Sequence, residues 1–573
     1  MRARPGPTVS SPLTHPSPRG RGVGEGGKVN RIPESATLAL LLTGAFVLFA
    51  FGLGDSTLWD QDEARYTQIA REILETGDFI TMHHNSAAWF VHPPLWMWLV
   101  ALTGWVFGFS EFTARIWSAV FGVLGVYATY LLGRLLFTAR AALLGSIVLM
   151  TTLQYFVQSR LAVFDTPLIA FMLLATYAFL RGVRERRRDL ILWAAAWAGL
   201  GTLTKGPIAL ILPSLALLTF FALRREPIPW RWIPWRGTIL VYSVIGLTWY
   251  VLEWWRHGFV FISTVVGYYL FNRFFGVVEA QSGPWWYYAP VFGIGAFPWT
   301  AFLVVIFPYL ARRWRDHEGS LFVLVWCAVT VGFYTVAGTK LPNYVLPVYP
   351  IAALGIGWLW EHALVGDPRA RAYVRVAFLA TALALAVGVW EVVTFARMQY
   401  AEQFASLQRH LVTLGVALII LFAVAVIFYV LRQPAAAFAG IAAVTVGMAA
   451  VLIGQTLPLV EAHRPIKQVS SIVLSELRPG EPLVAMGISS QQTLLYYTNH
   501  RLMWVDSPFE LLTAACYQRR ALIVTRPGMV EKWNEHLRLY GAVLKVEKIA
   551  EVGDLLVVRK DSDTLCRQPL IGR

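Results

Sequence analysis

The sequence predicts a polytopic α-helical membrane protein with a small α/β domain at its C-terminal end. Of the 573 residues, 57% are hydrophobic and only 14% are charged, and the mean hydropathy is +0.54. Soluble globular proteins do not have this composition. Apolar runs of about 18 to 22 residues recur along the chain, which is the length that a helix needs to cross a bilayer. From about residue 465 the hydropathy drops, and short helix-like and strand-like runs alternate instead.

The first membrane span is expected at residues 36–54, preceded by Lys28 and Arg31 and followed by acidic residues, so its N-terminus lies inside. Later apolar segments lie near 94–108, 115–136, 141–157, 163–180, 190–203, 206–223, 237–254, 287–310, 320–337, 343–363, 373–393, 410–431 and 436–456.

Basic loops indicate the sidedness of these spans. The loops at 133–140, 181–189, 224–236, 312–315 and 369–375 carry the arginines and are therefore expected inside. The acidic loop after the first span must be outside, so the alternation fails if 94–108 crosses the bilayer. We therefore expect 94–108 to be a short in-plane or re-entrant segment. The result is about 13 spans, with the N-terminus inside and the C-terminus outside.

Three regions follow from this pattern. Residues 1–34, rich in Pro, Gly, Ser and Arg, are predicted to be a disordered cytoplasmic tail or translation from a misassigned start. Residues 35–464 form the transmembrane domain, with a first external loop at 55–114 and a long external loop at 255–286. Residues 465–573 form the extracytoplasmic α/β domain. The net charge of +15 does not indicate nucleic-acid binding, because the bases sit in short loops between spans.

The first external loop holds the most unusual stretch of the chain. Its acidic residues are Asp55, Asp60, Asp62, Glu63, Glu72, Glu75 and Asp78. The spacing of Tyr66, Ile69 and Ile73 predicts a short amphipathic helix at the membrane surface. Asp62 and Glu63 then occupy its first turn, where the helix dipole favours carboxylates. Two adjacent acids are also what an ordinary helix cap with a solvated neighbour provides.

Two further ionic residues border spans on the same side. Asp165 in R-L-A-V-F-D-T-P-L opens a span; it could be a plain helix cap, but Arg160 five residues earlier suggests more, since ions at the membrane edge usually pair or have a function. Lys205 in L-T-K-G-P lies between two apolar spans, where Gly206 and Pro207 predict a tight turn. A cation fixed there suits a phosphate just above the membrane. The alternative is a lysine that extends to the interface.

Other cations and aromatic residues repeat this arrangement. Lys340 in G-T-K-L-P-N-Y, with Tyr344, has the same flanking pattern as Lys205 on the same face. Arg273 in L-F-N-R-F-F is a further candidate for a phosphate contact.

His83, His84 and His92 are the candidate metal ligands, although adjacent histidines rarely bind one ion and a polar loop with ordinary histidines is the alternative.

The collected residues favour group transfer from a lipid-linked donor. Carboxylates and cations meet at an outer membrane surface, and the sequence carries no Walker motif and no Rossmann glycine pattern. A polyprenyl-phosphate sugar fits: the cations hold the leaving phosphate and a carboxylate acts as base or stabilises developing charge. A flippase or transporter for lipid-linked sugars is the rival, but it needs polar residues along the spans. A structural assembly factor leaves the acids and cations unexplained.

Several motifs together resemble the GT-C glycosyltransferases. These are D-E-A-R-Y-x-x-I-A-R-E-I-L-x-x-G-D-F, H-P-P-L-W-M-W-L, F-x-x-R-I-W-S-A, R-L-A-V-F-D-T-P-L, G-L-G-T-L-T-K-G-P and K-L-P-N-Y-V-L-P-V-Y-P, in the family's order over about residues 36–465. The most similar branch contains the bacterial 4-amino-4-deoxy-L-arabinose lipid A transferases, related to protein O-mannosyltransferases. The resemblance implies an inverting transferase that uses an undecaprenyl-phosphate sugar, a lipid or protein acceptor, and a 13-span GT-C-like layout.

The resemblance also implies roles for individual residues. Asp62 takes the position of the catalytic Asp, with Glu63, Arg65 and Tyr66 beside it, and Asp165 is the second functional acid. The donor phosphate and its cavity are lined by Lys205, Arg273, Lys340 and Tyr344.

One departure concerns the segment before Pro93 and Pro94. The aminoarabinose branch carries Glu-Lys there, whereas this chain has Val91 and His92. His92 is then expected to replace the lysine as a phosphate contact. Because the missing Glu is associated with a metal in that branch, a divalent metal and aminoarabinose as the sugar are both left open. The protein O-mannosyltransferase alternative also remains, since the resemblance does not name the acceptor.

Overall fold

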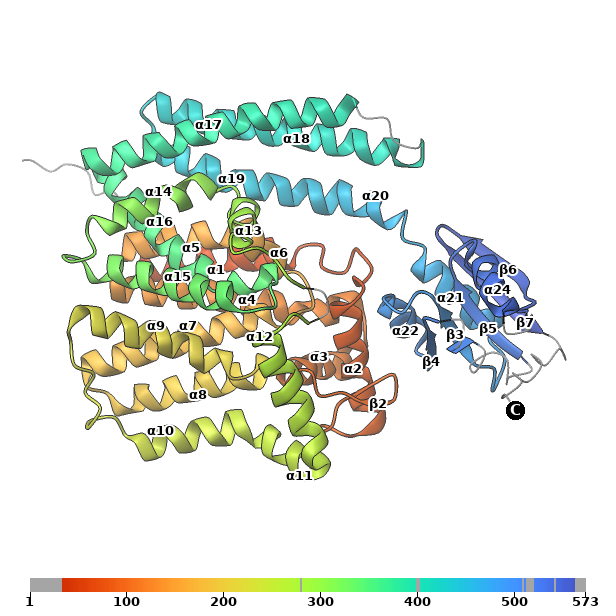
Figure 1. Cartoon of the computed structure of the whole chain (residues 1–573). Helices are drawn as coiled ribbons and strands as arrows, with labels where there is room; N and C mark the ends of the chain where they lie inside the picture. The colour runs from red at the N-terminus through yellow and green to blue at the C-terminus, as the bar shows by residue number, and fades with distance from the viewer. Residues whose placement is uncertain are drawn as a thin grey trace, which may run out of the picture.

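The structure, a computed structural model, describes residues 33–278, 281–397, 402–507, 510–511, 520–539 and 543–561. Nearly all of the tail predicted at 1–34 lies outside these residues. The described chain forms a bundle of long helices that run side by side, with an α/β domain at one end of the bundle (Figure 1).

The first part of the bundle contains α1 (Glu34–Ala50), α2 (Asp62–Thr76), α3 (Leu95–Phe107), α4 (Glu111–Leu136), α5 (Ala139–Met150), α6 (Leu153–Gln158), α7 (Asp165–Glu185), α8 (Arg188–Lys205) and α9 (Ile208–Arg224). A two-stranded hairpin, β1 (His83–His84) and β2 (Ala87–Ala88), lies between α2 and α3.

The second part contains α10 (Trp235–Tyr242), η1 (Ser243–Leu247), α11 (Thr248–Ile262), η2 (Ser263–Asn272), α12 (Arg273–Phe275), α13 (Tyr288–Gly295), α14 (Thr300–Ala311), α15 (Glu318–Val336), η3 (Pro342–Val345) and α16 (Val348–Val365). The bundle ends with α17 (Pro368–Arg397), α18 (Glu402–Val430), α19 (Pro434–Val451), η4 (Leu452–Thr456) and α20 (Leu457–Glu461).

Eight helices of the described chain are long and apolar enough to cross a membrane, or nine if the bent pair α13 and α14 is one span. The chain is therefore a multi-pass membrane protein, but the predicted count of about 13 spans is not confirmed. Several segments predicted as spans fold as shorter apolar helices: α1 and α9 have 17 residues each and α5 has 12. Segment 141–157 is divided between α5 and α6, because the helix is interrupted between Met150 and Leu153.

Segment 94–108 contains the 13-residue helix α3, which is not among those eight. Its Trp98 indole donates a hydrogen bond to the Phe79 carbonyl (2.8 Å). The external loop expected at 255–286 is largely helical instead, since α11, η2 and α12 continue to Phe275. The helical path is interrupted only at Gly258, whose φ of 56° is readily adopted by glycine.

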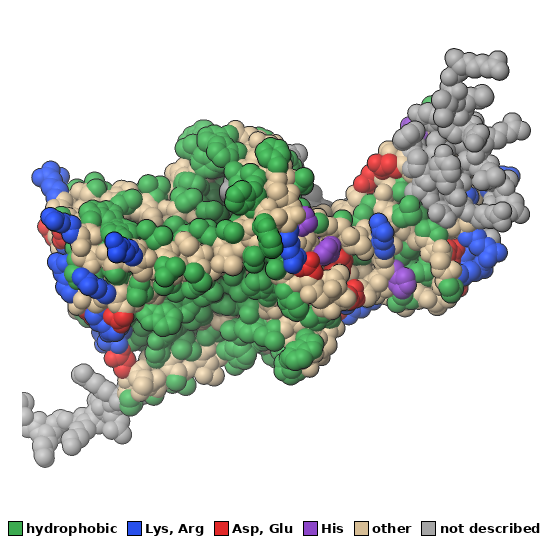
Figure 2. All heavy atoms as spheres, turned by 90° about the horizontal axis from the view of Figure 1, so that it is seen from below, with side chains coloured by type: hydrophobic (Ala, Val, Ile, Leu, Met, Phe, Trp, Pro, Cys, Tyr) green, Lys and Arg blue, Asp and Glu red, His purple; other side chains and the backbone are tan. Residues whose placement is uncertain are grey.

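The loops with the most arginines gather at one end of the bundle. Ion pairs connect them: Arg184 with Glu318, Arg224 with Glu318, Arg313 with Asp367, and Arg134 with Glu34. Figure 2 shows Lys, Arg, Asp and Glu side chains gathered at the end of the bundle remote from the α/β domain, with many hydrophobic side chains on the middle of the bundle. The surface is thus divided as a membrane-spanning protein requires: an apolar belt between two polar ends.

The C-terminal domain comprises α21 (Ile466–Glu476), β3 (Leu483–Met486), α22 (Gln492–Thr498), β4 (Leu502–Val505), β5 (Arg520–Thr525), α24 (Met529–Arg538), β6 (Glu547–Val552) and β7 (Leu555–Asp561). These strands form a five-stranded sheet in the order β4-β3-β5-β7-β6. Strand β3 pairs in parallel with β4 and β5, and the remaining pairs are antiparallel. Because β3 and most of β5 are buried, their side chains form continuous apolar runs, as expected for a covered sheet.

Candidate active site

A cavity of about 1290 Å³ opens at the end of the bundle near the α/β domain. Its lining comes from the first external loop, the turn between α8 and α9, η2 and α12, and the segment around η3. It brings together most of the residues predicted from the sequence: Asp62, Arg65, Tyr66, His84, His92, Asp165, Lys205, Arg273 and Tyr344.

Asp62 is the first residue of α2, and its carboxylate faces the cavity. The hydroxyl of Tyr66, one turn later, donates a hydrogen bond to Asp62 Oδ1 (3.1 Å). Although the side chain is open to the cavity, the surrounding protein removes water from it, and this desolvation raises the pKa of Asp62 above its ordinary value. Arg65 and Tyr66 oppose this rise in pKa. A carboxylate with a raised pKa is a better proton acceptor, which suits general-base chemistry.

Asp165 and Lys205 form an ion pair in the same cavity. Lys205 Nζ donates to Asp165 Oδ1 (2.5 Å), and the two side chains are 17% and 7% exposed. Asp165 is the first residue of α7 and Lys205 the last of α8. Gly206, with a φ of 106°, ends α8 and allows α9 to start immediately after Pro207. The turn therefore holds the ammonium group at a fixed place.

Arg273 is held by backbone pairing with the segment that follows α15. Gly338 N donates to the Phe274 carbonyl (2.8 Å) and Thr339 N to the Arg273 carbonyl (3.3 Å). A Cβ at Gly338 would stand 2.3 Å from a carbonyl oxygen, so only glycine permits this close approach. The Arg273 guanidinium donates to Gln281 Oε1 (3.2 Å) and lines the cavity.

Lys340 and Tyr344, from the same motif, occupy different places. Tyr344 lines the cavity, and its ring lies 5.9 Å from Lys205 Nζ. Lys340 is buried and is not among the described residues that line the cavity. Its ammonium group donates to the Ala337 carbonyl (2.8 Å), while its backbone N–H donates to the Gln281 carbonyl (2.9 Å). The structure therefore places Lys340 behind the wall that carries Arg273.

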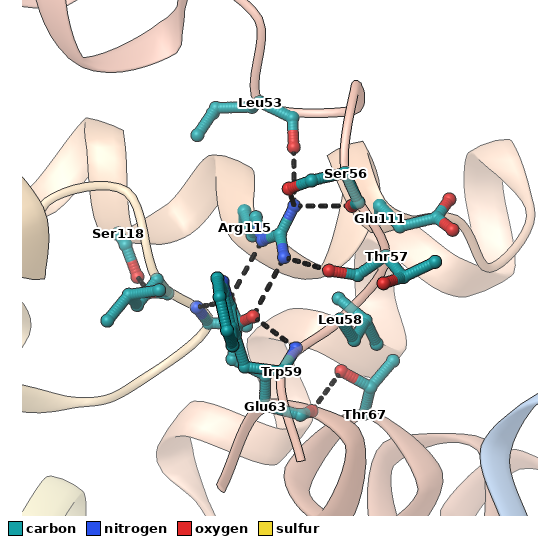
Figure 3. Close-up of polar contacts among 12 residues, drawn as sticks. Leu53, Ser56, Thr57, Leu58, Trp59, Glu63, Thr67, Glu111, Arg115 and Ser118 are labelled. Atoms are coloured by element: carbon teal, nitrogen blue, oxygen red, sulfur yellow. Dashed lines mark hydrogen bonds and ion pairs between the residues drawn. The ribbon is translucent and has the colours of Figure 1, made fainter. Parts of the chain in front are cut away.

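Glu63 follows Asp62 directly but is not among the described residues that line the cavity. It forms a buried ion pair with Arg115 (Figure 3). Arg115 donates from Nε and Nη2 to the two Glu63 oxygens at 2.9 and 2.8 Å. The backbone N–H groups of Trp59 and Ala162 donate to the same carboxylate. Both oxygens are thus fully occupied, and the geometry fits a residue that fixes the loop rather than one that reacts.

Arg115 completes this cluster by binding three backbone carbonyls. It donates to Leu53, Ser56 and Thr57, each at 2.9 Å (Figure 3). The cluster therefore joins the end of the first span, the start of α2 and helix α4. Sequence reasoning quoted Arg115 within F-x-x-R-I-W-S-A but assigned it no role.

Arg160 does not form the ion pair suggested for it with Asp165. Its guanidinium donates instead to the carbonyls of Leu48, Phe49 and Phe51 at 3.3, 3.0 and 2.6 Å. Carbonyls at the end of a helix lack partners within the helix, so Arg160 satisfies the last turn of α1.

The three predicted metal-ligand histidines do not meet at one point. His84 and His92 line the main cavity, whereas His83 lines a smaller pocket of about 300 Å³. Among the residues that the structure describes, no group of three or more His, Cys, Asp or Glu side chains could hold a metal ion. Burial lowers the pKa of His92 well below its usual value, and the charges of Lys205, Arg273 and Arg65 lower it further. At neutral pH, His92 therefore contributes a polar ring and no positive charge.

The charge balance of the cavity favours an anion. Its described lining carries the cations Arg65, Lys205 and Arg273 against the carboxylates Asp62 and Asp165. Apolar residues complete the wall, and several of them are exposed: Ile211 by 46%, Phe271 by 58% and Phe275 by 75%. The cavity thus combines a cationic centre with an apolar side. The lining also includes Tyr250, Asn343 and Gln492, to which the sequence analysis assigns no role. Tyr250 and Gln492 lie outside the quoted motifs, whereas Asn343 lies inside G-T-K-L-P-N-Y, next to Tyr344.

Three comparisons with known proteins agree with this architecture. The sequence model of the dolichyl-phosphate-mannose-protein mannosyltransferase family matches residues 91–254. An undecaprenyl phosphate-alpha-4-amino-4-deoxy-L-arabinose arabinosyl transferase from Pseudomonas aeruginosa is 29% identical over 344 residues, covering 57% of this chain and 60% of that protein. Its counterpart from an Enterobacter species is 29% identical over 358 residues, covering 59% and 61%. The chain therefore spans less than two thirds of these relatives' length.

The crystal structure of ArnT from Cupriavidus metallidurans bound to undecaprenyl phosphate matches with a TM-score of 0.76. The sequence identity is 23%, and the match covers 93% of this chain and 99% of ArnT. The chain is thus a multi-pass membrane protein with the fold of ArnT. Its sequence is similar to that of the aminoarabinose transferases, and residues 91–254 are similar to the protein mannosyltransferase family.

Proposed function

We propose that the chain is an inverting glycosyltransferase that moves a sugar from an undecaprenyl-phosphate carrier to a lipid or protein acceptor. The observation that carries the proposal is the shared cavity of Asp62, Asp165 and Lys205, beside an apolar wall. The proposal is supported by the relatives that act on an undecaprenyl-phosphate sugar and by the undecaprenyl phosphate bound to ArnT.

The proposed reaction is a direct displacement at the anomeric carbon. Asp62 accepts the proton of the acceptor hydroxyl, and the acceptor oxygen forms a bond to the sugar carbon. The bond between that carbon and the phosphate oxygen breaks, and undecaprenyl phosphate leaves with the electron pair. Because attack and departure occur on opposite faces, the configuration inverts.

The cations stabilise the departing phosphate. Lys205 and Arg273 are the phosphate contacts in this proposal, since both line the cavity with their cationic groups fixed by partners. Asp165 orients Lys205 through their ion pair. Arg65 lies nearer to Asp62, where it opposes the rise in the pKa of that carboxyl. Tyr344 and His92 complete the polar wall. Lys340 and Glu63 do not contact the donor in this proposal. Lys340 holds the Ala337 carbonyl, and Glu63 holds Arg115 and the backbone of Trp59 and Ala162.

The proposed location is the cytoplasmic membrane, with the cavity and the α/β domain on its outer face. The arginine-rich loops at the opposite end of the bundle support this orientation, because such loops remain in the cytoplasm. The prenyl chain of the donor then lies in the bilayer. The exposed apolar residues Ile211, Phe271 and Phe275 at the cavity provide a surface along which the prenyl chain can pass.

The test is sugar transfer in native membranes from radiolabelled undecaprenyl-phosphate sugars, comparing wild type with Asp62→Asn. We expect label to enter lipid or protein with wild type and a drop of at least about 100-fold with Asp62→Asn, as expected for loss of a general base. Equal transfer by both proteins would remove Asp62 from the proposed role. Label that crosses the membrane on its carrier without being transferred would identify a flippase instead.

A further inference from the structure

Helix α22 of the C-terminal domain docks directly on the first external loop. The Tyr497 hydroxyl donates to Glu111 Oε1 (2.9 Å) and accepts a hydrogen bond from Leu58 N (3.0 Å). Arg71 of α2 donates to the Tyr496 carbonyl (2.7 Å). In Figure 1, α22 lies beside α2 at the end of the bundle. The domain is therefore attached to the element that carries Asp62.

The first residue of α22, Gln492, enters the lining of the cavity. Its side chain is buried, with the whole residue only 7% exposed, and its Nε2 donates to the Ser489 carbonyl (3.0 Å). The Gln492 side chain contacts His84, and this contact favours the protonated form of the histidine. Neither Gln492 Oε1 nor His84 Nε2, both buried, has a hydrogen bond of normal geometry within the described chain. A ligand group that bridges the two side chains at the cavity wall would give each of them a well-aligned partner.

The chemistry of this pair indicates a neutral hydroxyl group. Burial, then the charge of Arg65, lowers the pKa of His84 to about 4, so its ring is uncharged at neutral pH. An amide oxygen accepts a hydrogen bond, and a neutral imidazole nitrogen donates or accepts one according to its tautomer. Together, the amide oxygen and the imidazole nitrogen can bind a hydroxyl group, whereas the cations Lys205 and Arg273 are suited to bind a phosphate.

The next residue, Thr493, holds the turn that presents Asp62. Its backbone N–H and its hydroxyl both donate to Asp60 Oδ1, at 3.0 and 2.6 Å. Between Asp60 and Asp62 stands Gln61, with φ 71° and ψ −101°, a conformation that side-chain-bearing residues rarely adopt. Such strain persists only when the surroundings hold it. The bonds from Thr493 are therefore part of what fixes the Asp62 carboxylate.

From these contacts we infer that α22 forms one wall of the acceptor subsite: Gln492, with His84, binds a hydroxyl of the acceptor, and Thr493 is a positioning residue for Asp62. This inference rests on the proposed transferase function and extends it, because it assigns the second substrate to the junction of the loop and the C-terminal domain.

The test measures sugar transfer in native membranes, which supply the endogenous acceptor. The concentration of the donor, a radiolabelled sugar linked to undecaprenyl phosphate, is varied. Gln492→Leu should lower the transfer rate roughly tenfold, the effect of one lost hydrogen bond to a buried group. The apparent KM for the donor should remain that of wild type. Gln491→Leu is the matched control, because this neighbouring glutamine is not among the described lining residues, and it should transfer at the wild-type rate.

If Thr493 positions Asp62, its loss changes the pH dependence of the transfer rate, which a purely structural role would not do. Thr493→Val should shift the acidic limb of the pH–rate profile, whereas Thr493→Ser, which keeps the hydroxyl, should restore it. Wild-type transfer by Gln492→Leu, or an equal loss in Gln491→Leu, would overturn the acceptor assignment while leaving the transferase intact. A raised donor KM in Gln492→Leu would also overturn it. No transfer by wild type from any donor would overturn the proposed function and this inference together.

Discussion

Replacing Glu63 by glutamine separates a structural role from a catalytic one. All four groups that reach this carboxylate are donors: two from Arg115 and the backbone N–H groups of Trp59 and Ala162. The amide of a glutamine must turn its own NH₂ toward one of them. The side chains of Arg115 and Glu63 are only 4% and 3% exposed, so the remaining guanidinium charge stays buried. Loss of one partner from such a pair costs about 3–5 kcal/mol.

This magnitude corresponds to a decrease of two to four powers of ten in the ratio of folded to unfolded protein, at roughly 1.4 kcal/mol for each power. The assay is unfolding by SDS in mixed micelles, applied to Glu63→Gln, Arg115→Met and the double variant. Each single variant should unfold at lower SDS. The double variant should lose less stability than the sum of the losses in the two single variants, because neither buried charge is then left without its partner. If Glu63→Gln is as stable as wild type but inactive in transfer, Glu63 is catalytic and the structural interpretation is wrong.

The remaining predictions concern the cavity and the first span. Lys205→Ala should weaken undecaprenyl phosphate binding by about 10- to 150-fold, the range for a lost hydrogen bond to a charged group; unchanged affinity by native mass spectrometry would exclude Lys205 as the phosphate contact. Tyr66→Phe removes the hydrogen bond that lowers the pKa of Asp62, so the acidic limb of the pH–rate profile should move to higher pH; a shift to lower pH would contradict the assignment of Asp62 as base. Arg160→Met should destabilise the protein to SDS by roughly 1–3 kcal/mol, since three carbonyls of the first span lose a charged partner; wild-type stability would contradict this.

The cavity-lining residues that the sequence indicates are those with local signals. The four-residue spacing of Asp62 and Tyr66 puts them on one helical face, and their side chains meet in the structure. The motif of Lys205, Gly206 and Pro207 predicts a tight turn, and the positive φ of Gly206 forms it. These features depend on neighbours within one turn of helix or loop.

The features that could not be predicted depend on distant parts of the chain. Glu63 and Arg115 are 52 positions apart, and nothing near either residue indicates the other. Thr493 lies 433 positions from Asp60, in another domain. The predicted count of about 13 spans is not confirmed for a related reason: hydropathy marks apolar segments but does not show that a helix such as α5 ends after 12 residues. The helix through 255–275 was likewise expected to be a loop, although this stretch is largely apolar.

In the proposed function, the cationic cavity holds the phosphate of a polyprenyl carrier beside Asp62. A cryo-EM structure of the full chain in nanodiscs with undecaprenyl phosphate would show where the phosphate binds. We expect the phosphate within hydrogen-bond distance of Lys205 and Arg273, with the prenyl chain passing Ile211, Phe271 or Phe275 toward the lipid. A phosphate bound elsewhere, with Lys205 still paired with Asp165 and Arg273 with Gln281, would contradict this binding mode.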